Sequence, residues 1–334
     1  MKKFFLLAAL IAMTAMLFAA GGGQQAPSSA AAKVVLKWGD VQPLTHPSVA
    51  MVERINAEVS AKTNGRVTIN VFPSGQLGSS RDQIEAVSTG TQDIVTEGAA
   101  NFGQWVPAIG ITEAPYIWRD MDHLVKTMNG TIGQDFSKEL IAKRNMRILG
   151  TTYYGVRQLT TTNRRVEKVA DMNGLKFRVP ENDIFRAMAE AWGAKPTPMS
   201  FNELYLALQQ SVVDAQENPL PTIDSGKFQE IQKFLILTSH VITPRLVVMN
   251  EGVFQKISPA DQKALIEAVA NGITWQNAEI KKQEASLIDT FKAAGMTVIT
   301  PNVDEFRKAV LDVVPKMFES RWGAGTWDKI QAVR

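Results

Sequence analysis

The chain has 334 residues and no cysteine, and its 36 basic and 33 acidic residues give a formal net charge of +3. The absence of cysteine excludes disulfides, thiolate catalysis and thiolate metal sites. The nearly balanced charge, with no basic run longer than the pair Arg164 and Arg165, argues against a nucleic-acid-binding surface.

Residues 1–20 have the layout of a secretory signal peptide, because two lysines precede an apolar run that ends in small residues. No other stretch approaches about eighteen consecutive apolar residues, so the mature protein is expected to lack a membrane span. Residues 21–32 are small and polar and predict a flexible tether. Gly21 stands where a lipoprotein signal needs cysteine, so lipid anchoring is unsupported and an exported, unanchored protein is expected.

The segment after the tether alternates predicted strands and helices. Alternating apolar residues predict strands at 34–40, 66–73 and 93–98. Between them, cap residues predict one helix from Pro47 to about Asn64 and another over 79–90. Parallel neighbours need crossover connections, so this β-α-β-α-β order predicts parallel strands covered by helices. The first domain is therefore predicted to be an α/β sandwich.

A similar alternation after Gly150 predicts a second α/β domain, as expected for about 300 mature residues. The predicted elements are strands at 174–180 and 212–218 and helices at 183–193 and 200–210. Ser200 and Glu203 have the spacing of a capping box at the start of the last helix.

A single long helix is predicted between Ser258 and Gly295. Ser258 caps it, Pro259 takes the first helical position, and Asp261 completes a capping-box pattern. Roughly 35 residues at 1.5 Å each span about 50 Å, which is longer than a domain is wide. We therefore expect this helix to lie across both domains, with Gly272 softening it, and to restrict their relative motion to hinge closure.

Sequence signals of catalysis and of metal binding are lacking. The three histidines, His46, His123 and His240, lie in different predicted elements without ligand spacing. No nucleophile elbow or phosphate-binding loop is present, and no carboxylate pair stands out. We expect no catalytic residue, no metal and no cofactor.

Polar side chains gather where predicted strands of the second domain end. Arg157 follows an apolar strand beside Gly155, Arg178 ends the strand over 174–180, and residues 216–218 end another. Ligands of open α/β sheets bind outside the carboxyl ends of strands, so these ends are expected to converge on one cleft. The alternative for Arg178 is a solvated strand face.

These residues lie in motifs that resemble those of the solute-binding proteins of tripartite ATP-independent periplasmic (TRAP) transporters. The motifs are FPSGQLG, YYGVRQLTTTNRRV, DMNGLKFRVP, GAKPTPMSFNELYLALQQSVVDAQENP and KFQEIQKFL, within Lys37 to about Gly295. The resemblance implies two α/β domains of the periplasmic binding protein fold, joined by strands and a long helix. A ligand cleft between the domains would close over an organic anion.

The resemblance also implies roles for site residues. Arg178 is expected to form a two-point salt bridge with the ligand carboxylate, because a guanidinium matches it with two parallel hydrogen bonds. Arg157 would assist, Asn218 would bond the same end of the ligand, and Phe201 would pack on the ligand body. From its place at the same strand end as Asn218, Gln216 is also expected to bind the ligand.

In the first domain the match to sialate-binding members is weaker. Their polar or acidic positions correspond to Val41, Ser80 and Gly98, two of which have no polar side chain. Glu97 is instead expected to accept hydrogen bonds from a smaller polyol, helped by Asn101 or Asp40. The alternative for Glu97 is a solvated loop carboxylate.

The predicted domains are 33–155 plus 244–283 for domain I and 156–243 plus 284–334 for domain II. As the resemblance implies, we expect a periplasmic, monomeric protein that captures a uronate, aldonate or keto-sugar acid by domain closure. It would deliver the ligand to the integral membrane subunits of a TRAP transporter without covalent chemistry. The alternatives are a sialate- or short-dicarboxylate-binding member, an exported sugar-acid lyase or isomerase, and a sensor or scavenger that lacks a transporter.

Overall fold

The computed structural model describes residues 33–334, so the predicted signal peptide and tether lie outside the described residues. The strands are β1 (Val34–Gly39), β2 (Val67–Phe72), β3 (Ile94–Gly98), β4 (Met146–Thr161), β5 (Lys176–Val179), β6 (Lys195–Pro198), β7 (Ala215–Pro219), β8 (Phe234–Asn250) and β9 (Thr297–Ile299). The α-helices are α1 (Pro47–Lys62), α2 (Ser80–Thr89), α3 (Met121–Asn129), α4 (Thr131–Arg144), α5 (Asp183–Ala191), α6 (Phe201–Gln209), α7 (Leu220–Ser225), α8 (Glu251–Lys256), α9 (Pro259–Ala293), α10 (Val303–Leu311), α11 (Val314–Trp322) and α12 (Thr326–Gln331). Short 3-10 helices are η1 (Ala99–Gln104), η2 (Pro107–Glu113), η3 (Val169–Met172) and η4 (Phe228–Glu230).

One mixed sheet connects the two halves of the described fold. The first half is built around β1, β2 and β3, and the second half around β5, β6 and β7. Its strand order is β2-β1-β3-β8-β4-β7-β5-β6, with β9 pairing β8. β1 pairs in parallel with β2 and with β3, which confirms the crossover prediction for the first half. The antiparallel strands β4 and β8 run through both halves, with β3 beside one end of the pair and β7 beside the other. The two halves are therefore joined by continuous strands.

The N-terminal caps of the helices agree with the sequence prediction at α2 but not at α6. Ser79 and Asp82 form a capping box at α2, and Gly90 ends that helix in the left-handed conformation, as predicted. At α6, Ser200 occupies the N-cap but its side chain makes no capping hydrogen bond, so the capping box predicted there is wrong. Ser200 lies instead on the wall of the cavity described below.

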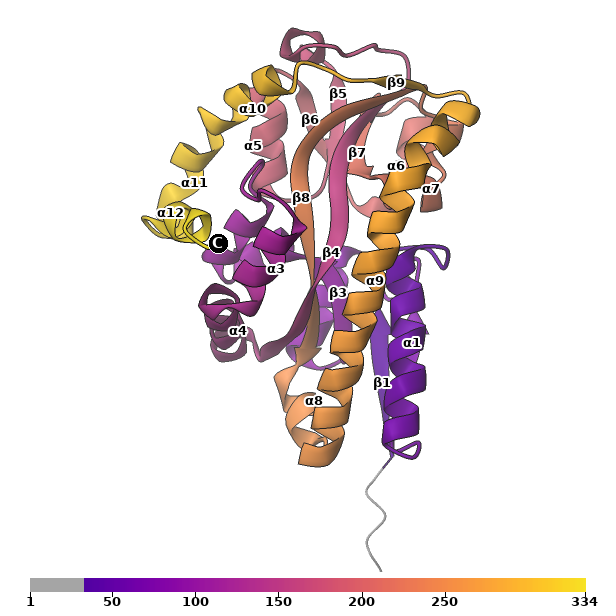
Figure 1. Cartoon of the computed structure of the whole chain (residues 1–334), viewed down its shortest axis with the longest axis vertical. Helices are drawn as coiled ribbons and strands as arrows, with labels where there is room; N and C mark the ends of the chain where they lie inside the picture. The colour runs from indigo at the N-terminus through magenta and orange to yellow at the C-terminus, as the bar shows by residue number, and fades with distance from the viewer. Residues whose placement is uncertain (1–32) are drawn as a thin grey trace, which may run out of the picture. The chain divides into compact units, whose positions relative to one another are not determined.

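The long helix α9 is one uninterrupted helix of 35 residues, as predicted. It packs on α1 at one end, on β4 in the middle and on α7 and β9 at the other end (Figure 1). Gly272 permits close packing on α1, where an added Cβ would lie 2.4 Å from Ile55 Cγ1. That this glycine softens the helix stays a prediction. Ser258 caps the helix, but the Asp261 carboxylate binds Arg66 rather than completing a capping box.

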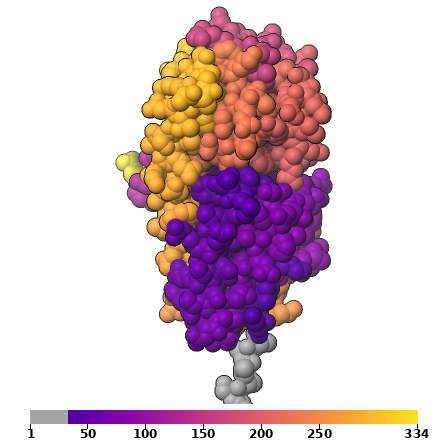
Figure 2. Space-filling view, turned by 90° about the vertical axis from the view of Figure 1, so that its right-hand side faces the viewer, coloured from indigo at the N-terminus to yellow at the C-terminus, as the bar shows by residue number. Residues whose placement is uncertain are grey.

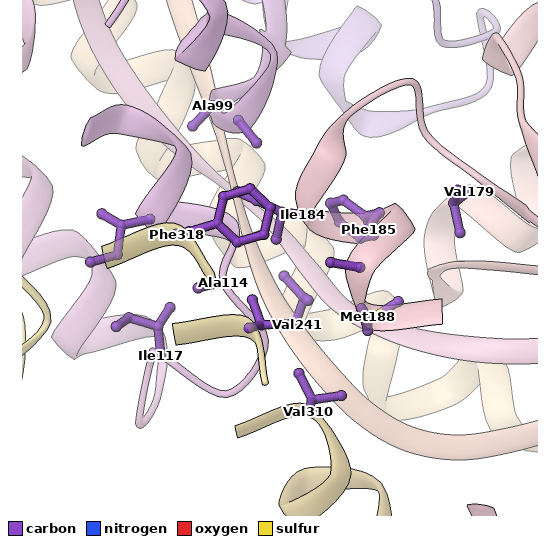
Figure 3. Packing of buried hydrophobic residues seen from close by; sticks show 14 of the residues in the cluster. Ala99, Ala114, Ile117, Val179, Ile184, Phe185, Met188, Val241, Val310 and Phe318 are labelled. Carbon is purple, nitrogen blue, oxygen red and sulfur yellow. The ribbon is translucent and has the colours of Figure 1, made fainter. Parts of the chain in front are cut away.

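Buried apolar residues form three clusters. One packs α1 and the start of α9 on β1 and β2, and another packs α6 and α7 on the end of α9. The third continues from Ala99 and Ile117 through Ile184 and Phe185 to Phe318 and Val310, so it contains residues of both halves (Figure 3). The apolar core therefore does not stop between the halves.

The junction of the halves is also visible on the surface. Figure 2 shows the indigo and purple residues of the first third of the chain meeting the salmon and orange residues along a seam. His46 is the N-cap residue of α1, and its Nε2 lies 3.3 Å from Thr222 Oγ1 of α7. The C-terminal segment bridges as well, because α11 packs on both α5 and η2 and Arg119 donates to the Gln331 carbonyl. The residue boundaries predicted for the two domains stay a prediction.

Candidate functional site

A cavity of about 480 Å³ lies where strands and helices of both halves meet. Six of the predicted site residues lie on its wall: Arg178, Arg157, Asn218, Phe201, Glu97 and Asn101. Gln216 lies behind the wall, since its amide donates to Thr160 Oγ1 at 2.7 Å and accepts from Asn218 Nδ2 at 2.6 Å. The expected convergence of three strands on one cleft is therefore observed, and Gln216 holds the Asn218 amide in place.

Arg178 is a buried guanidinium without a carboxylate partner in the described part of the chain. It projects from β5 and is 3% exposed, so the solvated-strand-face alternative is wrong. Nε and Nη2 donate to the Met199 carbonyl at 3.0 and 2.7 Å. Burial lowers the pKa of Arg178 to about 10, which reflects how poorly this cation is compensated. Arg178 lines the cavity, where a bound anion would compensate its charge.

Arg157 is buried as well, but its charge is compensated within the protein. It lies inside β4 rather than after a strand, which corrects the prediction, because β4 continues to Thr161. Its guanidinium binds both carboxylate oxygens of Glu217 and donates to Asn218 Oδ1 at 3.1 Å. Burial opposes the charge of Arg157, but attraction by Glu217 outweighs it and raises the pKa. Arg157 thus orients Asn218 and Glu217 beside Arg178.

Gly155 explains how β4 reaches this position. Its φ of +121° lies at a register shift between β4 and β8. An added Cβ would lie 2.8 Å from Pro219 Cβ and 2.9 Å from Glu284 Oε1. Gly155 therefore occupies a close backbone path with a positive φ, which a residue without a side chain adopts most readily.

The first half contributes a third buried arginine, Arg245 of β8, which was not predicted from the sequence. Arg245 donates to Asp40 Oδ1 at 2.8 Å and lies 3.8 Å from Glu97 Oε1. The signal in the sequence is a single basic residue in the apolar run VITPRLVVMN. Asp40 is engaged behind the wall by this pair and by the backbone N–H of Gln42, so it does not line the cavity.

Glu97 is 3% exposed, so the solvated-loop alternative is wrong. Its carboxylate accepts from Ser80 Oγ at 2.8 Å and from Asn101 Nδ2 at 3.3 Å. Burial raises the pKa of Glu97, although Arg245 opposes the shift. Carboxylate, hydroxyl and amide groups together give this wall both acceptors and donors for ligand hydroxyls.

Glu113, at the end of η2, is a further buried acid on the wall that the sequence analysis missed. Oε1 accepts from the backbone N–H of Ala100 at 2.9 Å. Burial raises the pKa of Glu113 to about 7. Its signal is a lone acid in the apolar stretch AIGITEAPYIW.

Three buried polar atoms on the wall have no hydrogen-bond partner among residues 33–334: Gln42 Oε1, Asn182 Nδ2 and Thr243 Oγ1. Buried polar groups are normally paired, so these atoms are suited to hydroxyl or carboxylate groups of a ligand. In the same range, no cluster of acidic and histidine residues has the arrangement of a metal site.

The sequence of this chain is similar to those of known proteins. Residues 38–321 match the sequence profile described as bacterial extracellular solute-binding protein, family 7. The sialic acid-binding periplasmic protein of Vibrio cholerae is 37% identical over 291 residues, which are 86% of this chain and 90% of that protein. The 2,3-diketo-L-gulonate-binding periplasmic protein of Escherichia coli K12 is 33% identical over 279 residues, or 84% of each protein.

Solved structures are similar too. A TRAP periplasmic solute-binding protein of Polaromonas sp. JS666, bound to D-erythronate, is 37% identical and covers 90% of this chain and 99% of its own. The TM-score between the two is 0.86. In the part of the chain that the structure describes, no helix is both long and apolar enough to cross a bilayer.

Proposed function

Because this chain belongs to family 7 of the bacterial extracellular solute-binding proteins, we propose that it captures a monocarboxylate sugar acid in the cavity beside Arg178. The observation that carries the proposal is Arg178 itself, which is buried and whose only hydrogen bonds within residues 33–334 are to the Met199 carbonyl. A carboxylate that docks there gains two parallel charged hydrogen bonds, each worth about 1.5–3 kcal/mol.

The charge balance of the wall favours one ligand carboxylate. Arg157 is paired with Glu217 and Arg245 with Asp40, which leaves Arg178 as the buried arginine of the wall without a carboxylate among the described residues. A second carboxylate on the ligand would meet Glu97 and Glu113. A short dicarboxylate is therefore disfavoured on electrostatic grounds.

The polar groups of the opposite wall favour a polyhydroxylated chain. Glu97, Ser80 and Asn101 form a connected hydrogen-bonding group, and Gln42 and Thr243 add unpaired polar atoms. Uronates, aldonates and keto-sugar acids match this pattern, as 2,3-diketo-L-gulonate and D-erythronate, the ligands named for two of the similar proteins, also suggest. Sialate is less well matched, because Val41 and Gly98 offer no polar side chain.

In the cell, the protein would act in the periplasm as a monomer. Closure of the two halves over the ligand would produce the form that the integral membrane subunits of a TRAP transporter accept. A ligand shifts this equilibrium only as far as it binds the closed form more tightly. The ligand leaves chemically unchanged, which distinguishes the proposal from an exported lyase or isomerase.

A thermal-shift screen tests the proposal. The processed protein is heated with hexuronates, aldonates including D-erythronate, keto-sugar acids, sialate and short dicarboxylates, and Arg178→Met is screened in parallel. A ligand at 100 times its Kd adds about 2.7 kcal/mol of stability, which raises Tm measurably. We expect sugar acids to shift the wild type and not Arg178→Met; no shift with any acid refutes the substrate class. Recovery of the ligand unaltered after hours with the protein separates binding from catalysis.

A further inference from the structure

Glu113 enters the cavity at a position where the neighbouring strand has no side chain. A Cβ built on Gly98 of β3 would lie 2.9 Å from Glu113 Oε1, so a larger residue at this position would displace the carboxyl from where it lies. Oε1 is held by the Ala100 N–H. The carboxyl makes no other hydrogen bond with residues 33–334, which leaves Oε2 for a ligand on the cavity wall.

The charged groups around Glu113 come from three strands. Glu97 of β3 and Glu217 of β7 repel a negative charge on it, and Arg157 of β4 attracts one. Arg157 is already bound to Glu217 through both carboxylate oxygens, so Glu113 has no cation of its own. An ionised Glu113 would therefore face two carboxylates and an incoming anion.

We propose that Glu113 is a specificity-determining residue that binds the ligand as the neutral acid, donating a hydrogen bond from its carboxyl to a ligand oxygen. Capture of the anion would then be linked to the uptake of one proton. This inference rests on the proposed function, because it concerns the same cavity and an anionic ligand. It goes further by making affinity depend on pH.

The sign of the linkage follows from the charge states. Burial already raises the pKa of Glu113 to about 7, and a bound anion nearby raises it further. Affinity is therefore highest below pH 7 and falls by up to tenfold per pH unit above it. Burial lowers the pKa of His46 to about 3 and lowers that of His240, so neither histidine changes charge above pH 7.

The test is calorimetry with D-erythronate, or with the panel acid that gives the largest thermal shift, at pH 6.5, 7.5 and 8.5. We expect Kd of the wild type to rise at least tenfold over this range. Glu113→Gln keeps a donor and an acceptor without a charge, so its Kd should change less than twofold. Glu97→Gln should keep the wild-type slope, which assigns the proton to Glu113 rather than to its neighbour.

A second readout does not depend on the variant folding. The binding enthalpy of the wild type at pH 7.5 is measured in phosphate and in Tris, whose ionisation enthalpies differ, and the difference reports protons taken up. A fraction of one proton supports the inference. A pH-independent Kd with no proton uptake, or an equal slope in Glu113→Gln, overturns it while leaving the proposed function intact. If no panel acid binds at any pH, the proposed function itself fails.

Discussion

The cavity has a first wall, which contains Arg245 and Glu97 of the first half, and a second wall, which contains Arg178 of the second half. The buried arginines of the two walls differ in their hydrogen-bonding partners. Arg245 of the first half and Arg178 of the second are each 3% exposed. Arg245 is bound by Asp40 and lies near Glu97, whereas Arg178 is bound, among the residues that the structure describes, only by a backbone carbonyl. A buried guanidinium whose charge is compensated by a carboxylate stabilises the fold. One that is bound by a single neutral carbonyl still has an uncompensated charge, which an anionic ligand could compensate.

The pKa values of the two arginines reflect the same difference. Burial disfavours both cations, but attraction by Asp40 and Glu97 raises the pKa of Arg245. Without such a partner, burial lowers the pKa of Arg178 to about 10. Two arginines with the same exposure thus differ in whether a carboxylate compensates their charge.

The largest expected effect concerns the first wall. Asp40→Asn leaves Arg245 buried without its principal carboxylate, and we expect a loss of about 3 kcal/mol in the free energy of unfolding, measured by urea titration. Asp183→Asn is the matched control, because Asp183 also binds a cavity-wall arginine, Arg321, but in an exposed pair. It should cost less than about 1 kcal/mol. Equal losses in the two variants would break the contrast between buried and exposed pairs.

Next in size is the effect on the second wall. Arg178→Lys removes the two-point fork, and we expect affinity for the sugar acid to fall at least about tenfold, or 1.4 kcal/mol, by calorimetry. The free energy of unfolding should change by less than about 1 kcal/mol, since Arg178 forms no ion pair within residues 33–334. Arg321→Lys should change affinity less than about threefold. Unchanged affinity in Arg178→Lys would show that this guanidinium does not hold the ligand.

A smaller effect, on the free energy of unfolding, is expected for a substitution at Gly155 of β4. Gly155→Ala places a Cβ at φ +121°, against Pro219 and Glu284, and we expect a loss of about 1 kcal/mol in the free energy of unfolding. Gly174→Ala tests positive φ alone, because nothing lies within 4 Å of its added Cβ. A loss in Gly155→Ala no larger than that in Gly174→Ala would mean that the contact with Pro219 adds nothing.

The smallest effect concerns the apolar part of the second wall. Phe201 packs edge-on against Phe228, with ring centroids 6.0 Å apart. Phe201→Leu keeps most of the apolar contact, and we expect affinity to fall less than about fivefold, or 1 kcal/mol. Leu206→Ala, at an exposed position of the same helix, should leave affinity unchanged. A tenfold loss in Phe201→Leu would place this ring on a par with Arg178.

The site residues that could be predicted are those carried by contiguous motifs. Arg178, Asn218 and Phe201 lie in segments whose strand and helix signals are local, and the structure places all three on the cavity wall. The predicted TRAP family resemblance and the two-domain α/β fold with its long helix are confirmed. Whether these residues contact a ligand stays a prediction.

The residues that were missed depend on partners far away in the chain. Arg245 lies 205 residues from its partner Asp40, and no motif joins them, so neither Arg245 nor this pairing was predicted. Glu113 appeared in the sequence as one acid among apolar neighbours, and only its position beside Gly98 gives it a place in the cavity.

The sequence by itself determined the elements of this protein. Alternating apolar residues, helix caps and prolines act between residues a few positions apart, so β1, α2, β5 and the full length of α9 were readable from it. The tertiary structure alone decided which buried charges are compensated. Strand pairing brings Glu217 to Arg157 and Asp40 to Arg245 but brings no carboxylate of the described chain to Arg178, and compensation of a buried charge depends on distances that only the folded sheet sets.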